Sequence, residues 1–227
     1  MTERKIAKLL KEMTIEEKVL QLQQVAANGD SETLKSFIHR GAGSFLHVLG
    51  KDSDAIRAEA EKTRMKIPPI FGIDAIHGHA LVNGAVVFPT QLAAACSWNR
   101  ELIRQMGKAT AEEVNADGLD FVFSPVLCLA RDTRWGRVDE TFGEDPFLAG
   151  ELGAAIVHGY EDDGLVAACL KHYIGYGEAT GAKDSYDTEI TERKIREVFL
   201  PPFIKGINAG ASSVMTAFGS LDGTPMS

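Results

Sequence analysis

Apolar positions follow two patterns that alternate along the chain. Apolar residues at helical spacing predict six helices, over residues 14–25, 31–40, 53–66, 99–118, 146–164 and 191–210. Short runs of almost continuous apolar character lie between them and predict five strands, over residues 42–50, 67–75, 119–127, 165–173 and 211–219. Thr14 and Glu17 form a capping box at the start of the first helix. The proline pair at 201–202 is expected to break the last helix.

Strands of this kind that alternate with helices predict a parallel sheet buried on both faces. An open doubly wound sheet and a closed eight-stranded barrel both fit. No glycine-rich dinucleotide fingerprint follows a strand, and polar residues instead follow several different strands, which favours the barrel. We therefore expect an α/β fold of the (β/α)8 TIM-barrel type, incomplete, with about five of its eight strand–helix units in residues 1–227.

Composition narrows the class of protein. The 227 residues are 44% hydrophobic and 25% charged, as in an ordinary globular domain. A net charge of -8 argues against nucleic acid as the main partner, because phosphate neutralisation needs a basic surface. No apolar run approaches the roughly 20 residues that span a bilayer, so no membrane association is expected. The charged amphipathic start is unlike a secretory signal and predicts a cytoplasmic location.

The cysteines and histidines give little support for a metal site. Cys96, Cys128 and Cys169 are odd in number and widely spread, so buried free thiols are expected. His77 and His79 follow the second strand without a carboxylate cluster, which favours structural hydrogen bonding over metal ligation. We expect no cofactor and no metal.

Asp74 stands at the end of the second strand and has two interpretations. A carboxylate at the mouth of a barrel can accept hydrogen bonds from sugar hydroxyls. The same residue can instead cap the turn that follows. The sequence alone leaves these two open.

The loop over residues 131–146 is dense in paired opposite charges. A fully solvated loop would not need Trp135 and Phe142 interleaved with three arginines. A structural ion-pair network is expected for Arg131, Asp132 and Glu144. One arginine is expected to face a pocket, because a guanidinium fork grips two vicinal hydroxyls or a carboxylate.

Lys171 and His172 end the fourth strand and are followed by Gly175 and Gly177. Neighbours on a strand normally point to opposite faces, so both reach one pocket only if the strand ends or twists there. The glycines allow that. The alternative is that one side chain points inward and the other outward.

The fifth strand carries two further candidates. Met215 and Phe218 line a pocket or simply pack in the core. Asp222 precedes a glycine and is expected to be a turn residue rather than a catalyst.

Taken together, these motifs resemble those of glycoside hydrolase family 3, the β-glucosidase and exo-glucanase group. The resemblance runs through MTIEEKVLQL, GIDAIHG, FPTQLAAACSWN, DTRWGR, ETFGEDP, KHYIGYG, LPPF and VMTAFGSLDGTPMS. The order of the motifs makes it specific. It implies that residues 1–227 are the N-terminal part of the family's barrel domain, with the rest of the barrel and a C-terminal domain outside this sequence.

The resemblance also implies the site. Asp74, Arg137, Lys171 and His172 would hold one glycosyl unit. Met215 and Phe218 would lie near the floor of this subsite, and many relatives carry Tyr or Asn where Phe218 stands.

The family's reaction is retaining, exo-acting hydrolysis of terminal β-D-glucosyl or related β-glycosyl residues, with two carboxyl groups about 5–5.5 Å apart. The nucleophile is an Asp in a Ser-Asp-Trp or Ser-Asp-His motif after the next strand and is expected beyond Ser227. The acid/base Glu is expected in a later domain. The loop KHYIGYGEATGAKDSYDT disfavours the β-N-acetylglucosaminidase branch, which carries a His within Lys-His-Phe-Pro-Gly-His-Gly.

The expected partner is a β-glucoside or β-linked oligosaccharide. Two alternatives stay open. A Schiff-base aldolase would use Lys171 as its nucleophile. A non-catalytic barrel piece would expose a strand edge and would form a homo-oligomer or pair with a complementing C-terminal segment.

Overall fold

The computed structural model describes residues 3–26 and 31–226. The chain divides into two compact units. The N-terminal unit comprises the described residues up to Ile73 together with 116–121. The C-terminal unit comprises residues 74–115 and those from 122 onward. Strand β4 (Phe121–Val122) begins in the first unit and ends in the second.

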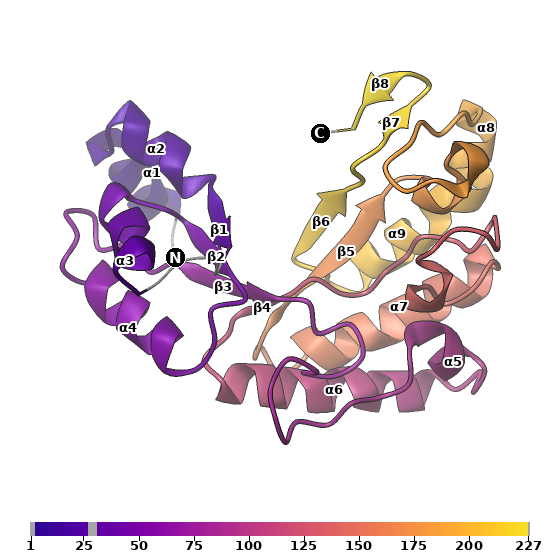
Figure 1. The fold of residues 1–227 in the computed structure, drawn as a ribbon, viewed down its shortest axis with the longest axis horizontal. Coiled ribbons are helices and arrows are strands. Elements are labelled where there is room, and N and C mark those ends of the chain that lie inside the picture. Colours follow the sequence, from indigo (N-terminus) through magenta and orange to yellow (C-terminus); the bar gives the residue numbers. More distant parts are fainter. Residues whose placement is uncertain (1–2, 27–30, 227) are drawn as a thin grey trace. The chain divides into compact units, whose positions relative to one another are not determined.

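The N-terminal unit alternates helices with short strands. Its elements are α1 (Glu3–Glu12), α2 (Ile15–Gln21), β1 (Gln24–Ala26), α3 (Ser31–Arg40), β2 (Ser44–Leu46), α4 (Lys51–Ala60) and β3 (Ile70–Ile73). β1 pairs with β2 and β2 with β3, both in parallel. Helices α3 and α4 lie on the same side of these strands (Figure 1).

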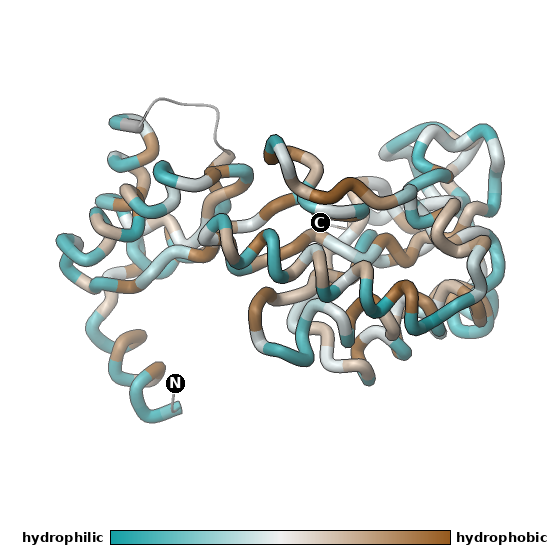
Figure 2. Tube along the Cα trace, turned by 90° about the horizontal axis from the view of Figure 1, so that it is seen from below, coloured by the Kyte–Doolittle hydropathy of each residue, from teal (hydrophilic) through white to brown (hydrophobic). Residues whose placement is uncertain are grey.

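The core of this unit lies between the strands and α3 and α4. The rings of Phe45 and Phe71 stack with centroids 5.7 Å apart, and Ile38 and Ile56 are buried on the two helices. Helix α1 is different, because none of its residues is buried. Its tube alternates between teal and brown next to the N label (Figure 2), as an amphipathic sequence requires.

The C-terminal unit carries the longer elements. They are α5 (Gln91–Ala95), α6 (Arg100–Ala116), α7 (Pro146–Glu161), β5 (Ala167–Tyr173), α8 (Glu192–Lys194), α9 (Leu200–Asn208), β6 (Ser213–Thr216), β7 (Ser220–Leu221) and β8 (Thr224–Pro225). β5 and β6 pair in parallel, and α7 packs against α9 and β5 (Figure 1). Helix α7 approaches α6 closely at Gly159, where a Cβ would lie 2.3 Å from the carbonyl oxygen of Arg104.

The five predicted strands are all present, and the predicted capping box joins Thr14 and Glu17. β1 was missed, because two of its three residues, Gln24 and Val25, fall inside the apolar pattern that predicts a helix to residue 25. The α-helix is interrupted just before the proline pair, as expected. A π-helical turn over Ile195–Phe199 links α8 to α9, and the prolines occupy the first turn of α9, where a missing N–H costs little.

The hairpin of β7 and β8 confirms the prediction for Asp222. Asp222 and Gly223 form its two-residue turn, with φ of 48° and 76°. Positive φ at both central residues is the geometry of a type I′ turn.

In each unit the parallel strands follow chain order and alternate with helices. This is the construction of a (β/α)8 barrel, so the predicted fold class, an incomplete α/β barrel, is confirmed. Among the described helices, none has the length and apolar character that crossing a membrane requires.

Candidate functional site

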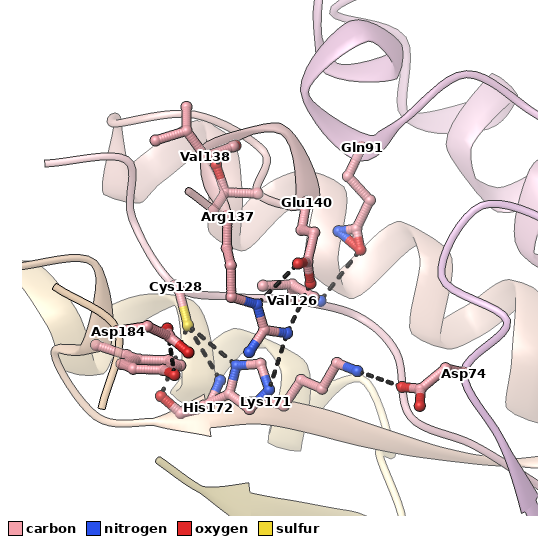
Figure 3. A network of polar contacts seen from close by, with 12 residues as sticks. Asp74, Gln91, Val126, Cys128, Arg137, Val138, Glu140, Lys171, His172 and Asp184 are labelled. Carbon is pink, nitrogen blue, oxygen red and sulfur yellow. Dashed lines mark hydrogen bonds and ion pairs between the residues drawn. The ribbon is translucent and has the colours of Figure 1, made fainter. Parts of the chain in front are cut away.

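Four of the six predicted site residues meet at the ends of strands in the C-terminal unit. Asp74 directly follows β3, Arg137 lies in the loop between β4 and α7, and Lys171 and His172 end β5. Figure 3 shows their side chains converging. With Glu140 they form the site network (Asp74, Arg137, Glu140, Lys171 and His172).

Lys171 and Asp74 form the first half of the site network. The Lys171 Nζ donates to Asp74 Oδ1 at 2.7 Å. The lysine side chain is only 5% exposed, whereas that of Asp74 is 43% exposed. The lysine is therefore held in the protein interior and the carboxylate faces solvent, where it can also meet a ligand.

The backbone around Lys171 is fixed from the side of β4. The Lys171 N–H donates to the carbonyl of Pro125 at 3.0 Å, and Val126 forms a parallel bridge with Lys171. Gln91 on α5 supports the same segment, because its Oε1 accepts a hydrogen bond from the Val126 N–H at 3.1 Å. The strand that carries the lysine is therefore held on one side by β6 and on the other by residues 125–127.

Arg137 and Glu140 form the second half. Two guanidinium nitrogens of Arg137, Nε and Nη2, each donate to a Glu140 carboxylate oxygen at 2.7 Å. A 3₁₀ turn over Val138–Glu140 places the carboxylate three residues after the arginine, which allows this bidentate pair. The hydrogen bonds to Glu140 raise the pKa of Arg137 further above its ordinary value.

His172 lies between these pairs and is neutral. Burial, followed by the positive charges of Arg137 and Lys171, lowers its pKa to about 3. Its Nε2 lies 3.5 Å from Arg137 Nη2, which can only donate, so Nε2 accepts and the ring proton sits on Nδ1. Nδ1 faces the sulfur of Cys128 at 3.5 Å.

Cys128 supports the histidine from behind. Its Sγ accepts a hydrogen bond from the His172 N–H at 3.2 Å, and burial raises the pKa of its thiol to about 12. All three cysteines are free, and Cys128 and Cys169 are buried as predicted. The prediction is wrong for Cys96, which is exposed because it follows the last residue of the short helix α5.

An aromatic layer packs beneath the site network. The rings of His172 and Tyr176 meet edge to face with centroids 5.3 Å apart, and Tyr176 meets Trp135 in the same way at 5.2 Å. Asp184 accepts hydrogen bonds from the Tyr176 hydroxyl at 2.5 Å and from Trp135 Nε1 at 3.4 Å. This layer fixes the orientation of the histidine ring.

The loop over residues 131–146 behaves largely as predicted. Trp135 and Phe142 are buried, at 2% and 1% exposure. Arg131 lies 3.6 Å from the Glu178 carboxylate, and Arg134 pairs with Asp132 at 2.6 Å. No ion pair within 4.0 Å is found for Glu144 in the described part of the chain, so its expected place in the network is wrong. Arg137 is the arginine that reaches the strand end.

The other candidate residues from the sequence, His77, Met215 and Phe218, are not part of the site network. His77 Nδ1 lies 3.1 Å from the Phe88 carbonyl oxygen, which confirms a structural hydrogen bond. Within residues 3–26 and 31–226, no three His, Cys, Asp or Glu side chains gather as a metal site would require. Met215 pairs in register with Lys171 and is partly buried, whereas Phe218 is 74% exposed. Their roles stay predictions.

Several residues that contact the site network were not predicted from the sequence. Cys128, Tyr176 and Asp184 meet the others only through the register of residues 124–127 against β5 and the path of the loop after β5. Glu140 had a usable signal, since a carboxylate three residues after an arginine in a turn is within reach of it.

Comparison with known proteins gives the family. The family model described as Glycosyl hydrolase family 3 N terminal domain matches residues 14–227. A periplasmic β-glucosidase of Salmonella typhimurium is 32% identical over 232 residues, which cover 97% of this chain and 29% of that protein. The chain therefore belongs to glycosyl hydrolase family 3, and residues 14–227 correspond to its N-terminal domain.

Solved structures agree with this assignment. The crystal structure of a β-glucosidase from Listeria innocua in complex with isofagomine matches with a TM-score of 0.89 and 38% identity, over 100% of this chain and 33% of that one. An exo-1,3/1,4-β-glucanase from a Pseudoalteromonas species matches with a TM-score of 0.91 and 32% identity, over 99% and 31% respectively. The chain thus spans about a third of the length of these relatives.

The predicted cytoplasmic location is wrong as an inference from this sequence. The Salmonella relative is a periplasmic enzyme by name. Membership of the family therefore does not imply the cytoplasm.

Proposed function

We propose that this chain supplies the sugar-binding subsite of a retaining β-glucosidase. The observation that carries the proposal is the site network, in which carboxylate, cationic and imidazole side chains meet at the strand ends. Asp74 is more exposed than its partner Lys171 and can accept hydrogen bonds from hydroxyls. Arg137 and Lys171 can donate to others. The relatives, β-glucosidases by name, support this substrate class.

Each member has a defined part in the proposed subsite. Asp74 accepts hydrogen bonds from two hydroxyl groups of a terminal β-glucosyl unit. Lys171 holds the carboxylate in place and donates to a neighbouring hydroxyl. His172, neutral and with its proton on Nδ1, presents Nε2 as an acceptor that Arg137 now occupies and that a hydroxyl can take over. Met215 and Phe218 form the floor beneath the ring.

We further propose that the two catalytic carboxyl groups come from a segment outside residues 1–227. A retaining mechanism needs a nucleophile and an acid/base about 5–5.5 Å apart. Within the site network, Arg137 holds both oxygens of Glu140, and Asp74 pairs with Lys171 and has the sugar-binding part proposed above. By this proposal residues 1–227 are the first part of one barrel domain.

The aldolase alternative is disfavoured by the same geometry. A Schiff-base lysine must lose its proton to attack a carbonyl. Lys171 donates at 2.7 Å to a carboxylate, and a lysine paired in this way is a poor nucleophile.

Calorimetric titration with isofagomine, the ligand of the Listeria relative, tests the subsite. The chain is expected to bind it, and Lys171→Met and Arg137→Gln are each expected to weaken binding at least tenfold. Lys8→Met is the matched control, because this lysine side chain is 77% exposed in the N-terminal unit. Equal binding by Lys171→Met and the unchanged chain would remove the basis of the proposal.

Release of nitrophenol from its β-D-glucoside tests the assignment of the carboxyl groups. Residues 1–227 alone are expected to give no turnover above background. Turnover by this chain would mean that a carboxylate within it is catalytic, and Asp74→Asn and Asp222→Asn would then identify which.

We also propose that a complementing segment covers β6. Strands of a barrel are covered on both faces, yet Val214 on β6 is 44% exposed. Ile204 and Ile207 on the neighbouring helix α9 are also about half exposed. The chain alone is therefore expected to self-associate. A compact monomer in size-exclusion light scattering would contradict this proposal.

A further inference from the structure

A groove in the C-terminal unit has no part in the site network. It runs from the start of α6 along most of α7, two helices that lie side by side (Figure 1). Two adjoining hollows make it up, of about 760 Å³ and 340 Å³. Both volumes lie in the range of about 300–1,000 Å³ that is usual for small-molecule sites. Trp98, Arg100 and Glu151 line both hollows.

Two aromatic side chains stand exposed on this groove. Trp98 is 75% exposed and Phe147 is 69% exposed, although large aromatic residues are normally buried. Trp98 also has a φ of 51°, an uncommon conformation for a residue with a side chain. Lys205 Nζ lies 4.1 Å from the centroid of the Phe147 ring and covers one of its faces. The Trp98 ring therefore offers the larger free surface.

The groove between the rings is lined by charged groups held in fixed positions. Arg100 Nη1 donates to Glu151 Oε2 at 2.6 Å, and Lys205 pairs with the other oxygen of the same carboxylate. These pairs, led by the hydrogen bond from Lys205, lower the pKa of Glu151. His158 lies further along the wall, 3.0 Å from Asp162.

We infer that this groove is a second carbohydrate-binding site, for a β-linked glucan chain rather than a single sugar. A pyranose ring has one apolar C–H face and a rim of hydroxyls. The face suits the ring of Trp98, and the rim suits the planar groups of Arg100 and Glu151. Trp98, Phe147 and Arg100 would also suit a protein interface, where such residues are enriched, so binding to a protein is a separate outcome of the test.

The choice of a β-glucan as ligand rests on the proposed function. The description of the groove is independent of that proposal. Two adjoining hollows with an aromatic residue at their junction have room for a ligand of more than one ring.

Affinity electrophoresis in gels that contain soluble β-1,3/1,4-glucan tests the inference. The chain is expected to be retarded, and Trp98→Ala is expected to weaken the apparent affinity about tenfold, the size expected for one aromatic contact. Phe147→Ala is expected to weaken it less, because one face of that ring is already covered. Leu102→Ala is the matched control, since Leu102 is 51% exposed on α6 and lines a different hollow.

The variant Lys171→Met separates this inference from the proposed function. Retardation that persists in Lys171→Met and falls in Trp98→Ala supports a groove site. Retardation that falls only in Lys171→Met, or that is absent from the unchanged chain, overturns the groove site, while isofagomine binding continues to test the subsite.

Two measurements guard against other causes. Circular dichroism should show that Trp98→Ala is folded, as expected for an exposed side chain. The glucan should also protect Trp98 from acrylamide quenching, because the other tryptophan, Trp135, is buried. If Trp98→Ala instead changes the sedimentation of the chain and leaves retardation unchanged, the groove is a protein interface and the inference is wrong.

Discussion

The charged side chains of the C-terminal unit occupy two contrasting regions. One is the site network, where the Lys171 side chain is 5% exposed and Arg137 is 26% exposed. The other is the surface helix segment of residues 192–197. There Arg193 pairs with Glu197 at 3.0 Å, with side chains 83% and 58% exposed. The pair distances are similar in the two regions, so distance alone does not distinguish a site from a solvated surface.

The two regions differ in how deeply their charged pairs are buried. A charged pair in water gains little, because solvent screens it and two long side chains lose freedom. A buried charge depends on its partner, since removing that partner leaves it without compensation. The same residue types therefore stabilise little on the surface helix segment and constrain the structure strongly in the site network.

The largest expected effect is an asymmetry within the Asp74–Lys171 pair. Asp74→Asn leaves a buried ammonium without its carboxylate and is expected to lower the free energy of unfolding by about 3 kcal/mol. Lys171→Met leaves an aspartate that is already 43% exposed, and the loss is expected to stay below about 1 kcal/mol. Urea denaturation measures both, and equal losses would show that burial does not govern this pair.

The next effect concerns the backbone behind the site network. A Cβ at Gly177 would lie 1.9 Å from the carbonyl oxygen of Leu129, and backbone cannot move aside easily. Gly177→Ala is expected to lower the free energy of unfolding by about 1–3 kcal/mol. Gly136→Ala is the matched control, because nothing lies within 4 Å of a Cβ there. Thermal denaturation that ranks the two variants the other way round would contradict the packing described.

The third prediction is that buried His172 makes the free energy of unfolding depend on pH. The unfolded chain takes up a proton at His172 below about pH 6.5, whereas the folded chain, with the pKa lowered to about 3, does not. The unfolded state binds more protons in this window, so the free energy of unfolding falls as the pH falls, by about 1 kcal/mol per unit.

His172→Gln tests this by difference. Between about pH 6.5 and 4.5 the variant is expected to lose stability less steeply than the unchanged chain. Comparing the two chains cancels the contribution of the carboxylates. Parallel curves would show that His172 is protonated in the folded state.

The smallest effect is expected on the surface helix segment. Arg193→Ala removes a pair whose members are both mostly exposed, and the free energy of unfolding should change by less than about 0.5 kcal/mol. Isofagomine binding should be unchanged. A loss comparable to that of Asp74→Asn would erase the contrast between the two regions.

Much of the site could be predicted from the sequence, for a physical reason. In a barrel the carboxyl ends of parallel strands meet at one face, so polar residues that end successive strands converge. Asp74, Lys171 and His172 follow this rule and needed only the order of strands. The pattern of the loop predicted that one arginine faces the site, and the family resemblance identified it as Arg137.

The rest depended on information that a pattern does not contain. The contact of Cys128 with His172 is set by the register of residues 124–127 against β5, and the Tyr176 contact by the path of the loop after β5. β1 is only three residues long and was absorbed by a helical apolar pattern. The exposed Trp98 was not anticipated, because a tryptophan within an apolar motif is ordinarily buried.

The position of Cys128 has a chemical consequence. Its thiol is 3% exposed and its pKa is raised to about 12, so at neutral pH it is neither accessible nor ionised enough to react with an alkylating reagent. Cys96 is exposed and free, and Cys169 is buried. A maleimide dye should therefore label one position in the native protein. Slow labelling of Cys128, identified by mass spectrometry, would then measure the rate at which the structure behind His172 opens.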